Sequence, residues 1–224
     1  IIMDTLDVNL ITKVKPLDKQ RTTNNKLRNA SITMAILPLA ACGSSGASLT
    51  HETPGTNGST VSSTPNLING SVGNDDINGG DGDDDIHGGD GDDDIHGDAG
   101  DDTIWTGSGN DLINGGDGDD GIYGEAGHDT ISGGVGNDDI HGDDGNDDIH
   151  GDAGNDTISG GNGSDTINGG DGDDVIYGID VNNNINGGAD IDVIDGGNGN
   201  DTIHGAAGND TISGGNGSDT INGG

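Results

Sequence analysis

The nonapeptide GGDGDDDIH, residues 79–87, is one copy of a unit that repeats through most of the chain. Its eighth position is isoleucine, and an isoleucine falls on every ninth residue from Ile68 to Ile221, eighteen times without an insertion or a deletion. Helices repeat every 3.6 residues and strands every two, so neither explains a period of nine. A fixed period of this length is typical of a solenoid whose units stack on their neighbours.

Glycine and aspartate also recur at fixed positions of this unit, in seventeen copies that span residues 70–222. Glycine opens every unit but the one that starts at Thr106, and it occupies position four except at Val181 and Asp190. Position six is aspartate in sixteen units and Asn183 in the other. The sixteen are Asp75, Asp84, Asp93, Asp102, Asp111, Asp120, Asp129, Asp138, Asp147, Asp156, Asp165, Asp174, Asp192, Asp201, Asp210 and Asp219.

Each part of the unit has a physical reason. Glycines before the aspartate allow the backbone to take positive φ or to approach a neighbouring turn closely. Calcium takes six to eight oxygen ligands in flexible geometry, so backbone carbonyls and one carboxylate from each of two stacked turns would form a suitable site. The last three residues predict a short strand that buries only its isoleucine.

The unit resembles the RTX, or haemolysin-type, calcium-binding nonapeptide. The resemblance implies an all-β fold, a calcium-loaded parallel β-roll (β-solenoid) in which two units make one coil. It also implies that the sixteen aspartates are metal ligands, with each ion between unit n and unit n+2. Seventeen units form fifteen such pairs, and since Val181, Asn183 and Asp190 break the pattern, we expect about 11 to 13 calcium ions. The broken units predict a soft point, either a loose turn or a hinge.

The charge distribution also favours a fold that depends on calcium. All six Lys and Arg residues precede Asn29, whereas 39 of the 42 Asp and Glu residues follow it. With no basic patch, nucleic-acid binding is not expected. A chain with this much acid and glycine and so few large apolar residues is by composition typical of disorder. We therefore expect calcium to supply the folding free energy that the isoleucines alone do not.

The N-terminal region predicts export. Residues 1–41 are interpreted as a signal peptide with an extended n-region, because Leu39-Ala40-Ala41-Cys42 resembles the lipobox of bacterial lipoproteins. The apolar stretch, residues 32–41, is too short for a transmembrane helix. Cys42 is then the lipidated residue that anchors the protein to a membrane, and Gly43 is compatible with the outer membrane of a Gram-negative bacterium. An ordinary signal peptide or an incidental free thiol is the alternative.

Two further boundaries follow. Residues 42–67 are rich in Ser, Thr and Gly and predict a flexible linker, and residues 68–224 predict the β-roll. Residues 205–224 repeat residues 151–170 at 19 of 20 positions. The earlier copy continues into further repeats, whereas neither a cap nor a C-terminal secretion signal follows the later one. We therefore expect the roll to be truncated at its C-terminus.

No catalytic motif is present: there is no nucleophile elbow, HExxH or P-loop, so we do not expect an enzyme. Histidines recur only at position nine within the repeats, apart from His128, and are expected at solvated strand edges, with zinc binding the alternative. With an eighteen-residue coil, Trp105, Tyr123 and Tyr177 share one sheet. This face is a candidate contact surface for a glycan or a protein, and strand propensity is the alternative reason for the aromatics.

The sequence as a whole predicts calcium binding that couples folding to extracellular calcium in a surface or secreted protein. The alternative is the repeat region of a larger RTX toxin, secreted hydrolase or adhesin. An ice-binding module ranks below both, because positions three and five carry Asp, Asn and Ala rather than aligned threonines.

Overall fold

The computed structural model describes residues 48–51, 58–59 and 65–224. The signal peptide predicted at residues 1–41 and the lipidation site Cys42 lie outside these ranges. Within them every regular element is a strand, and no helix is long and apolar enough to cross a membrane.

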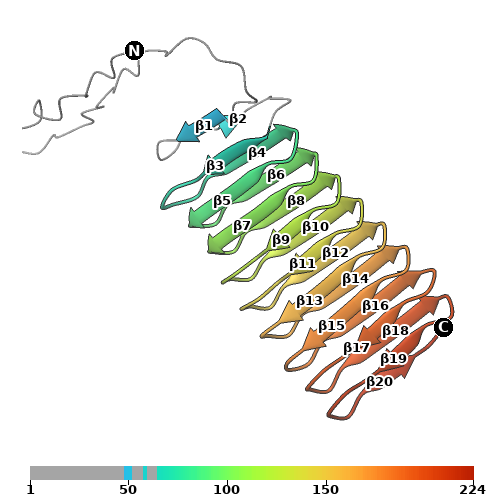
Figure 1. Ribbon diagram of the computed structural model, residues 1–224. Helices are drawn as coiled ribbons and strands as arrows, with labels where there is room; N and C mark the ends of the chain where they lie inside the picture. Colours follow the sequence, from blue (N-terminus) through green and yellow to red (C-terminus); the bar gives the residue numbers. More distant parts are fainter. Residues whose placement is uncertain (1–47, 52–57, 60–64) are drawn as a thin grey trace, which may run out of the picture. The chain divides into compact units, whose positions relative to one another are not determined.

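Two parallel sheets of ten strands face each other (Figure 1). The first sheet contains β1 (Ser48–His51), β3 (Asn66–Asn69), β5 (Asp85–Asp90), β7 (Thr103–Ser108), β9 (Gly121–Tyr123), β11 (Asp139–His141), β13 (Thr157–Gly161), β15 (Val175–Ile179), β17 (Val193–Asp195) and β19 (Thr211–Ser213). The second contains β2 (Gly58–Ser59), β4 (Asp76–Asp81), β6 (Asp94–Ala99), β8 (Leu112–Asp117), β10 (Thr130–Val135), β12 (Asp148–Ala153), β14 (Thr166–Asp171), β16 (Asn184–Ala189), β18 (Thr202–Ala207) and β20 (Thr220–Asn222).

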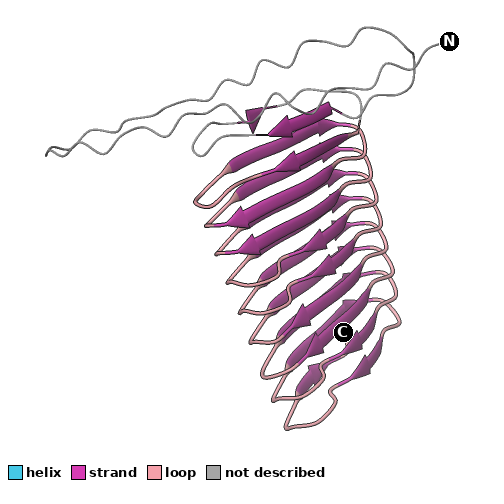
Figure 2. Cartoon of the chain, turned by 60° about the vertical axis from the view of Figure 1, so that its left-hand side comes forward, coloured by secondary structure: helices cyan, strands magenta, loops and turns pink. Residues whose placement is uncertain are grey.

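The chain alternates between the sheets, and each strand pairs with the strand one coil later. Ile86 pairs with Ile104 in the first sheet and Ile95 with Ile113 in the second, both eighteen residues apart. One coil therefore contains two nonapeptides, and the predicted parallel β-roll is confirmed. Figure 2 shows the result, with strands on both sides joined by short turns at the edges.

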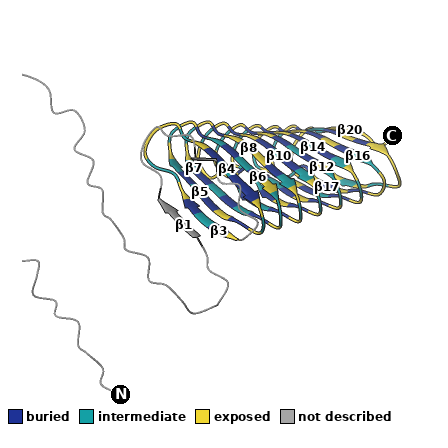
Figure 3. Cartoon of the chain, turned by 90° about the horizontal axis from the view of Figure 1, so that it is seen from above, coloured by how far each residue is buried: buried dark blue, intermediate teal, exposed yellow. Residues whose placement is uncertain are grey.

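The isoleucines form the hydrophobic core. From Ile68 to Ile203, sixteen successive isoleucines are buried, and none is more than 4% exposed. Their neighbours in each strand point away from the core, which gives the alternation of buried and exposed residues in Figure 3. Burial of one isoleucine per unit fixes the register, because a slip of one residue would expose the whole column.

The turns need glycine at position four because successive coils approach closely there. A β-carbon on Gly109 would clash with the carbonyl oxygen of Gly91, one coil earlier. Several of these glycines have φ between 130° and 155°, such as Gly91 at 137° and Gly109 at 154°. Residues with a side chain rarely adopt that conformation.

The two units that lack glycine at position four have a different backbone conformation there. Val181 and Asp190 adopt left-handed helical φ values of 62° and 71°. Ile179, at position two of the same unit as Val181, also has positive φ, at 79°. Positive φ is an outlier for β-branched residues and costs about 1 to 3 kcal/mol. The coil continues through this turn, but its backbone is strained.

Replacing Val181 with glycine should therefore stabilise the roll. Relief of about 1 to 3 kcal/mol of strain outweighs the added backbone entropy of about 0.5 to 1 kcal/mol. Val181 is half exposed, so little burial is lost. We expect a gain of about 1 to 2 kcal/mol in urea unfolding with saturating calcium. The matched control is Val135→Gly, because Val135 is similarly exposed but lies in β10 without positive φ. An equal gain in both variants would contradict the strain argument.

Candidate functional site

The position-six aspartates lie inside the turns rather than on the surface. Thirteen of them, from Asp84 to Asp201, are at most 2% exposed, which is unusual for a charged side chain. Asp75, Asp210 and Asp219 are partly exposed because they belong to the first and last coils of the repeat array.

From Asp84 onwards, one oxygen of each carboxylate accepts a hydrogen bond from the backbone of the preceding coil. The N–H of Asp84 donates to Oδ1 of Asp102 at 2.7 Å, and the N–H of Asp102 donates to Oδ1 of Asp120 at 2.8 Å. Equivalent bonds link all fifteen pairs of units n and n+2, from Asp75 to Asp219. The coils therefore place every predicted pair of position-six residues side by side.

The second oxygen of the carboxylate is buried without a hydrogen-bond partner. This is true of Oδ2 in fourteen residues: Asp84, Asp93, Asp102, Asp111, Asp120, Asp129, Asp138, Asp147, Asp156, Asp165, Asp174, Asp192, Asp201 and Asp210. A buried polar atom without a partner costs about 1 to 3 kcal/mol, and more when it is charged. Fourteen such atoms at equivalent positions indicate a missing cationic partner.

The position-one glycines hold the space beside these oxygens open. A β-carbon on Gly97 would clash with Oδ2 of Asp102 and with the carbonyl oxygen of Gly115 in the next coil. Most of the other position-one glycines have the same surroundings, as at Gly151, next to Asp156 and Gly169. A carboxylate oxygen and a backbone carbonyl thus converge on one small volume, and this donor set fits calcium.

Burial shifts the titration of these carboxyl groups. Desolvation is the main cause, and the pKa of Asp102, Asp129, Asp138 and Asp174 rises to about 7. Repulsion from Asp120 and Asp84 adds to the rise at Asp102, whereas the hydrogen bond from the Asp84 backbone opposes it. A nearby divalent cation would reverse this preference and favour the ionised form.

Asn183 shows how one turn is satisfied without a cation. Its Oδ1 accepts the N–H of Asp165 at 2.8 Å, so the ladder of hydrogen bonds is intact. Its Nδ2 occupies the place of Oδ2 beside Gly178 and donates to the carbonyl oxygen of Asp180 at 3.1 Å. The amide therefore supplies the positive end of a dipole where fourteen other units present an unpartnered oxygen.

Among the residues that the structure describes, no three His, Cys, Asp or Glu side chains converge on a metal-binding position. Four of the five position-nine histidines, which were the alternative zinc ligands, each contact the aspartate two residues earlier in the same strand, whereas Nδ1 of His204 lies 3.5 Å from Nδ2 of Asn222. These side-chain contacts, 3.1 to 3.3 Å long, are His87–Asp85, His96–Asp94, His141–Asp139 and His150–Asp148.

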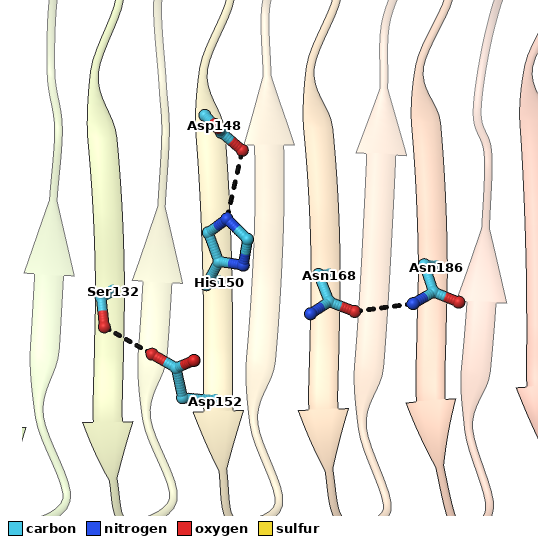
Figure 4. A network of polar contacts seen from close by, with 6 residues as sticks. All are labelled: Ser132, Asp148, His150, Asp152, Asn168 and Asn186. Atoms are coloured by element: carbon cyan, nitrogen blue, oxygen red, sulfur yellow. Dashed lines mark hydrogen bonds and ion pairs between the residues drawn. The ribbon is translucent and has the colours of Figure 1, made fainter.

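Polar side chains contact one another on the outer face of the second sheet, and Figure 4 shows three of these contacts. Nε2 of His150 lies 3.3 Å from Oδ1 of Asp148 in β12. Ser132 donates to Asp152 at 2.5 Å, and Nδ2 of Asn186 donates to Oδ1 of Asn168 at 2.8 Å. Polar contacts within one strand and between neighbouring strands therefore cover this exposed face.

A second ladder of hydrogen bonds, which was not predicted from the sequence, joins the position-five residues. The position-five side chain accepts the N–H of the position-five residue one coil later, as in Asp101 to Asp83 at 3.1 Å and Asp119 to Asp101 at 3.0 Å. The signal was available, because thirteen of seventeen position-five residues are Asn or Asp. This ladder runs opposite to the position-six ladder, so the two together tie each coil to both neighbours.

Comparison with known families agrees with this geometry. The family model of the RTX calcium-binding nonapeptide repeat (4 copies) matches residues 62–95, 87–122, 96–131, 123–158, 150–178, 177–212 and 196–224. No curated protein matched the chain significantly. Since the family matches run through residues 62–224, most of the sequence, the chain belongs to the RTX calcium-binding nonapeptide repeat family.

Proposed function

We propose that the position-six aspartates bind calcium between successive coils and that this binding drives the chain to fold. RTX repeats bind calcium, and their β-roll is a structural calcium-binding fold. The observation that carries the proposal is the set of fourteen buried Oδ2 atoms without a partner. Fifteen pairs of units, less those disturbed by Val181, Asn183 and Asp190, give about 11 to 13 ions.

Equilibrium dialysis against calcium tests both the number of ions and the role of the carboxylates. We expect about 11 to 13 bound ions at saturation near pH 7.5. Burial raises the pKa of Asp93 to about 6 and that of Asp102 and Asp129 to about 7, above the ordinary value of 3.8. The metal-free roll therefore gains stability as the pH falls from about 7 towards 4, and protons compete with calcium over the same window.

Calcium affinity should thus fall about tenfold between pH 7.5 and pH 5.5, because carboxyl groups whose pKa is raised to about 7, such as Asp102 and Asp129, are protonated at the lower pH. The dialysis is repeated at both pH values with the ionic strength held constant. Three or four ions at saturation would contradict the proposed sites, and an unchanged affinity would contradict the role of the buried carboxylates.

RTX repeat proteins are generally secreted or extracellular. Extracellular calcium modules typically bind with dissociation constants of about 10⁻⁴ to 10⁻³ M. With such an affinity the chain would be unfolded at cytosolic calcium and folded outside the cell. The same module would serve a free-standing surface protein or the repeat region of a larger toxin, hydrolase or adhesin.

We further propose that Cys42 is lipidated and holds the protein at the outer membrane. Replacing Cys42 with serine should move the product from the membrane fraction to the soluble fraction, since the acyl chains provide the anchor. Incorporation of labelled fatty acid gives an independent measurement. Gly43→Ala is the control, because it leaves the cysteine in place. If Cys42→Ser leaves fractionation unchanged, or if the parent protein takes up no label, the anchor is wrong.

A further inference from the structure

The outer face of the first sheet carries a stack of four rings. His87 stacks on Trp105 with ring centroids 4.6 Å apart, Trp105 on Tyr123 at 5.7 Å, and Tyr123 on His141 at 5.1 Å. The planes are within 10° of parallel. Because the rings cover one another's faces, a sugar ring cannot stack between them. The stack instead presents a rib of aromatic ring edges across β5, β7, β9 and β11.

Two hollows lie beside this rib, each over glycine at position two. The rings of His87 and Trp105 form the walls of the first hollow, which is about 370 Å³. Gly89 and Gly107 form its floor, and the carboxylates of Asp90 and Glu125 lie at its rim. The second hollow, about 430 Å³, is lined by the ring of His141, by Gly161, by the carboxylates of Asp143 and Asp144 and by Ile179. A β-carbon on Gly89, Gly107 or Gly161 would clash with a backbone carbonyl oxygen of the preceding coil.

A wall of aromatic rings with carboxylates at the rim suits a lysine or arginine side chain. The methylene stem packs along the ring edges and the glycine backbone, and the cationic head reaches the rim. The rim acids Asp90, Glu125, Asp143 and Asp144 are exposed, and none of them is a position-six residue. No Lys or Arg follows Arg28, so this surface has no fixed positive charge of its own.

The spacing of the hollows sets the spacing of the ligand's side chains. The first is centred near β7 and the second near β13, three strands further along the sheet. Three strand spacings of about 4.8 Å give roughly 14 Å. Four residues of extended chain at about 3.3 Å each span roughly 13 Å, and residues four apart point to the same side.

From these observations we infer that the outer face of the first sheet binds extended basic polypeptides, with a Lys or Arg side chain at residues i and i+4 in the two hollows. This inference rests on the calcium-driven fold proposed above and names a partner for one of its surfaces. The rings wall the hollows, and the rim carboxylates select positive charge.

The test uses the calcium-loaded chain and a dye-labelled Gly/Ser peptide with two arginines at i and i+4. Binding is followed by fluorescence anisotropy, and Trp105 emission is recorded in parallel. The double variant Glu125→Gln, Asp143→Asn should weaken binding about tenfold, because each exposed charge pair contributes modestly. A peptide of the same composition with adjacent arginines should bind several-fold more weakly.

The matched control is Asp98→Asn with Asp152→Asn on the second sheet. Both residues also occupy position two and have positive φ, and replacing them also removes two charges. The stack of four rings does not lie beside them. The control should change binding less than about twofold. Equal weakening by both double variants, or insensitivity to arginine spacing, would overturn the inference in favour of bulk charge. Circular dichroism separates the two proposals: a chain that does not fold with calcium refutes the first, whereas a folded chain that does not bind refutes only this one.

Discussion

Replacing Asp102, Asp120 and Asp138 with alanine is expected to raise the calcium concentration at the folding midpoint at least about tenfold. The three residues follow one another along one edge of the roll, joined by hydrogen bonds from Asp102 to Asp120 and from Asp120 to Asp138. Each carries a buried Oδ2 without a partner. Removal of three adjacent carboxylates leaves successive turns without their anionic ligand, so calcium no longer offsets the entropy of ordering them.

Alanine also removes the Oδ1 acceptor from a backbone N–H, which costs about 1 to 3 kcal/mol for each unsatisfied group. The triple asparagine variant separates the two effects. Asn183 shows that an amide keeps the Oδ1 bond to the preceding coil. Asparagine at the three positions should therefore retain the ladder and still raise the calcium midpoint, because the lost charge, rather than the lost hydrogen bond, weakens the site.

The matched control removes three charges outside the turns. Asp85, Asp94 and Asp139 lie at position seven, where each pairs with a histidine on the outer face of a sheet. Replacing all three with alanine should change the midpoint less than about twofold, because exposed ion pairs contribute little. Circular dichroism during calcium titration measures all three variants. If the position-six and position-seven triples shift the midpoint equally, total charge governs binding and the turn geometry does not.

The fold follows from the sequence because one physical constraint dominates it. A buried isoleucine every nine residues allows a single register, and Ile86 opposite Ile104 is the direct consequence. The pairing of units n and n+2, implied by the family resemblance, is present as hydrogen bonds between position-six residues. Their role as calcium ligands stays a prediction, supported by burial and by the unpartnered oxygens.

Other features depend on rotamers and hydrogen-bond direction, which the repeat does not encode. The sequence shows that Asn183 departs from the repeat, but it does not predict that the Asn183 amide donates to the Asp180 carbonyl. It places Trp105 and Tyr123 on one sheet, but not in a parallel stack with His87 and His141. The positive φ of Ile179 was likewise not expected, because the repeat leaves position two variable.

The dependence of folding on calcium is the central claim, and far-ultraviolet circular dichroism tests it most directly. With excess chelator the 39 acids that follow Asn29 repel one another and the buried carboxylates lack their partner, so we predict a coil spectrum. Millimolar calcium should produce a cooperative strand signal, and Trp105 emission should change with it. Equal magnesium should have little effect, because its strict octahedral geometry suits these turns poorly. Strand signal that persists in excess chelator would show that the isoleucine core folds unaided, and would contradict the account.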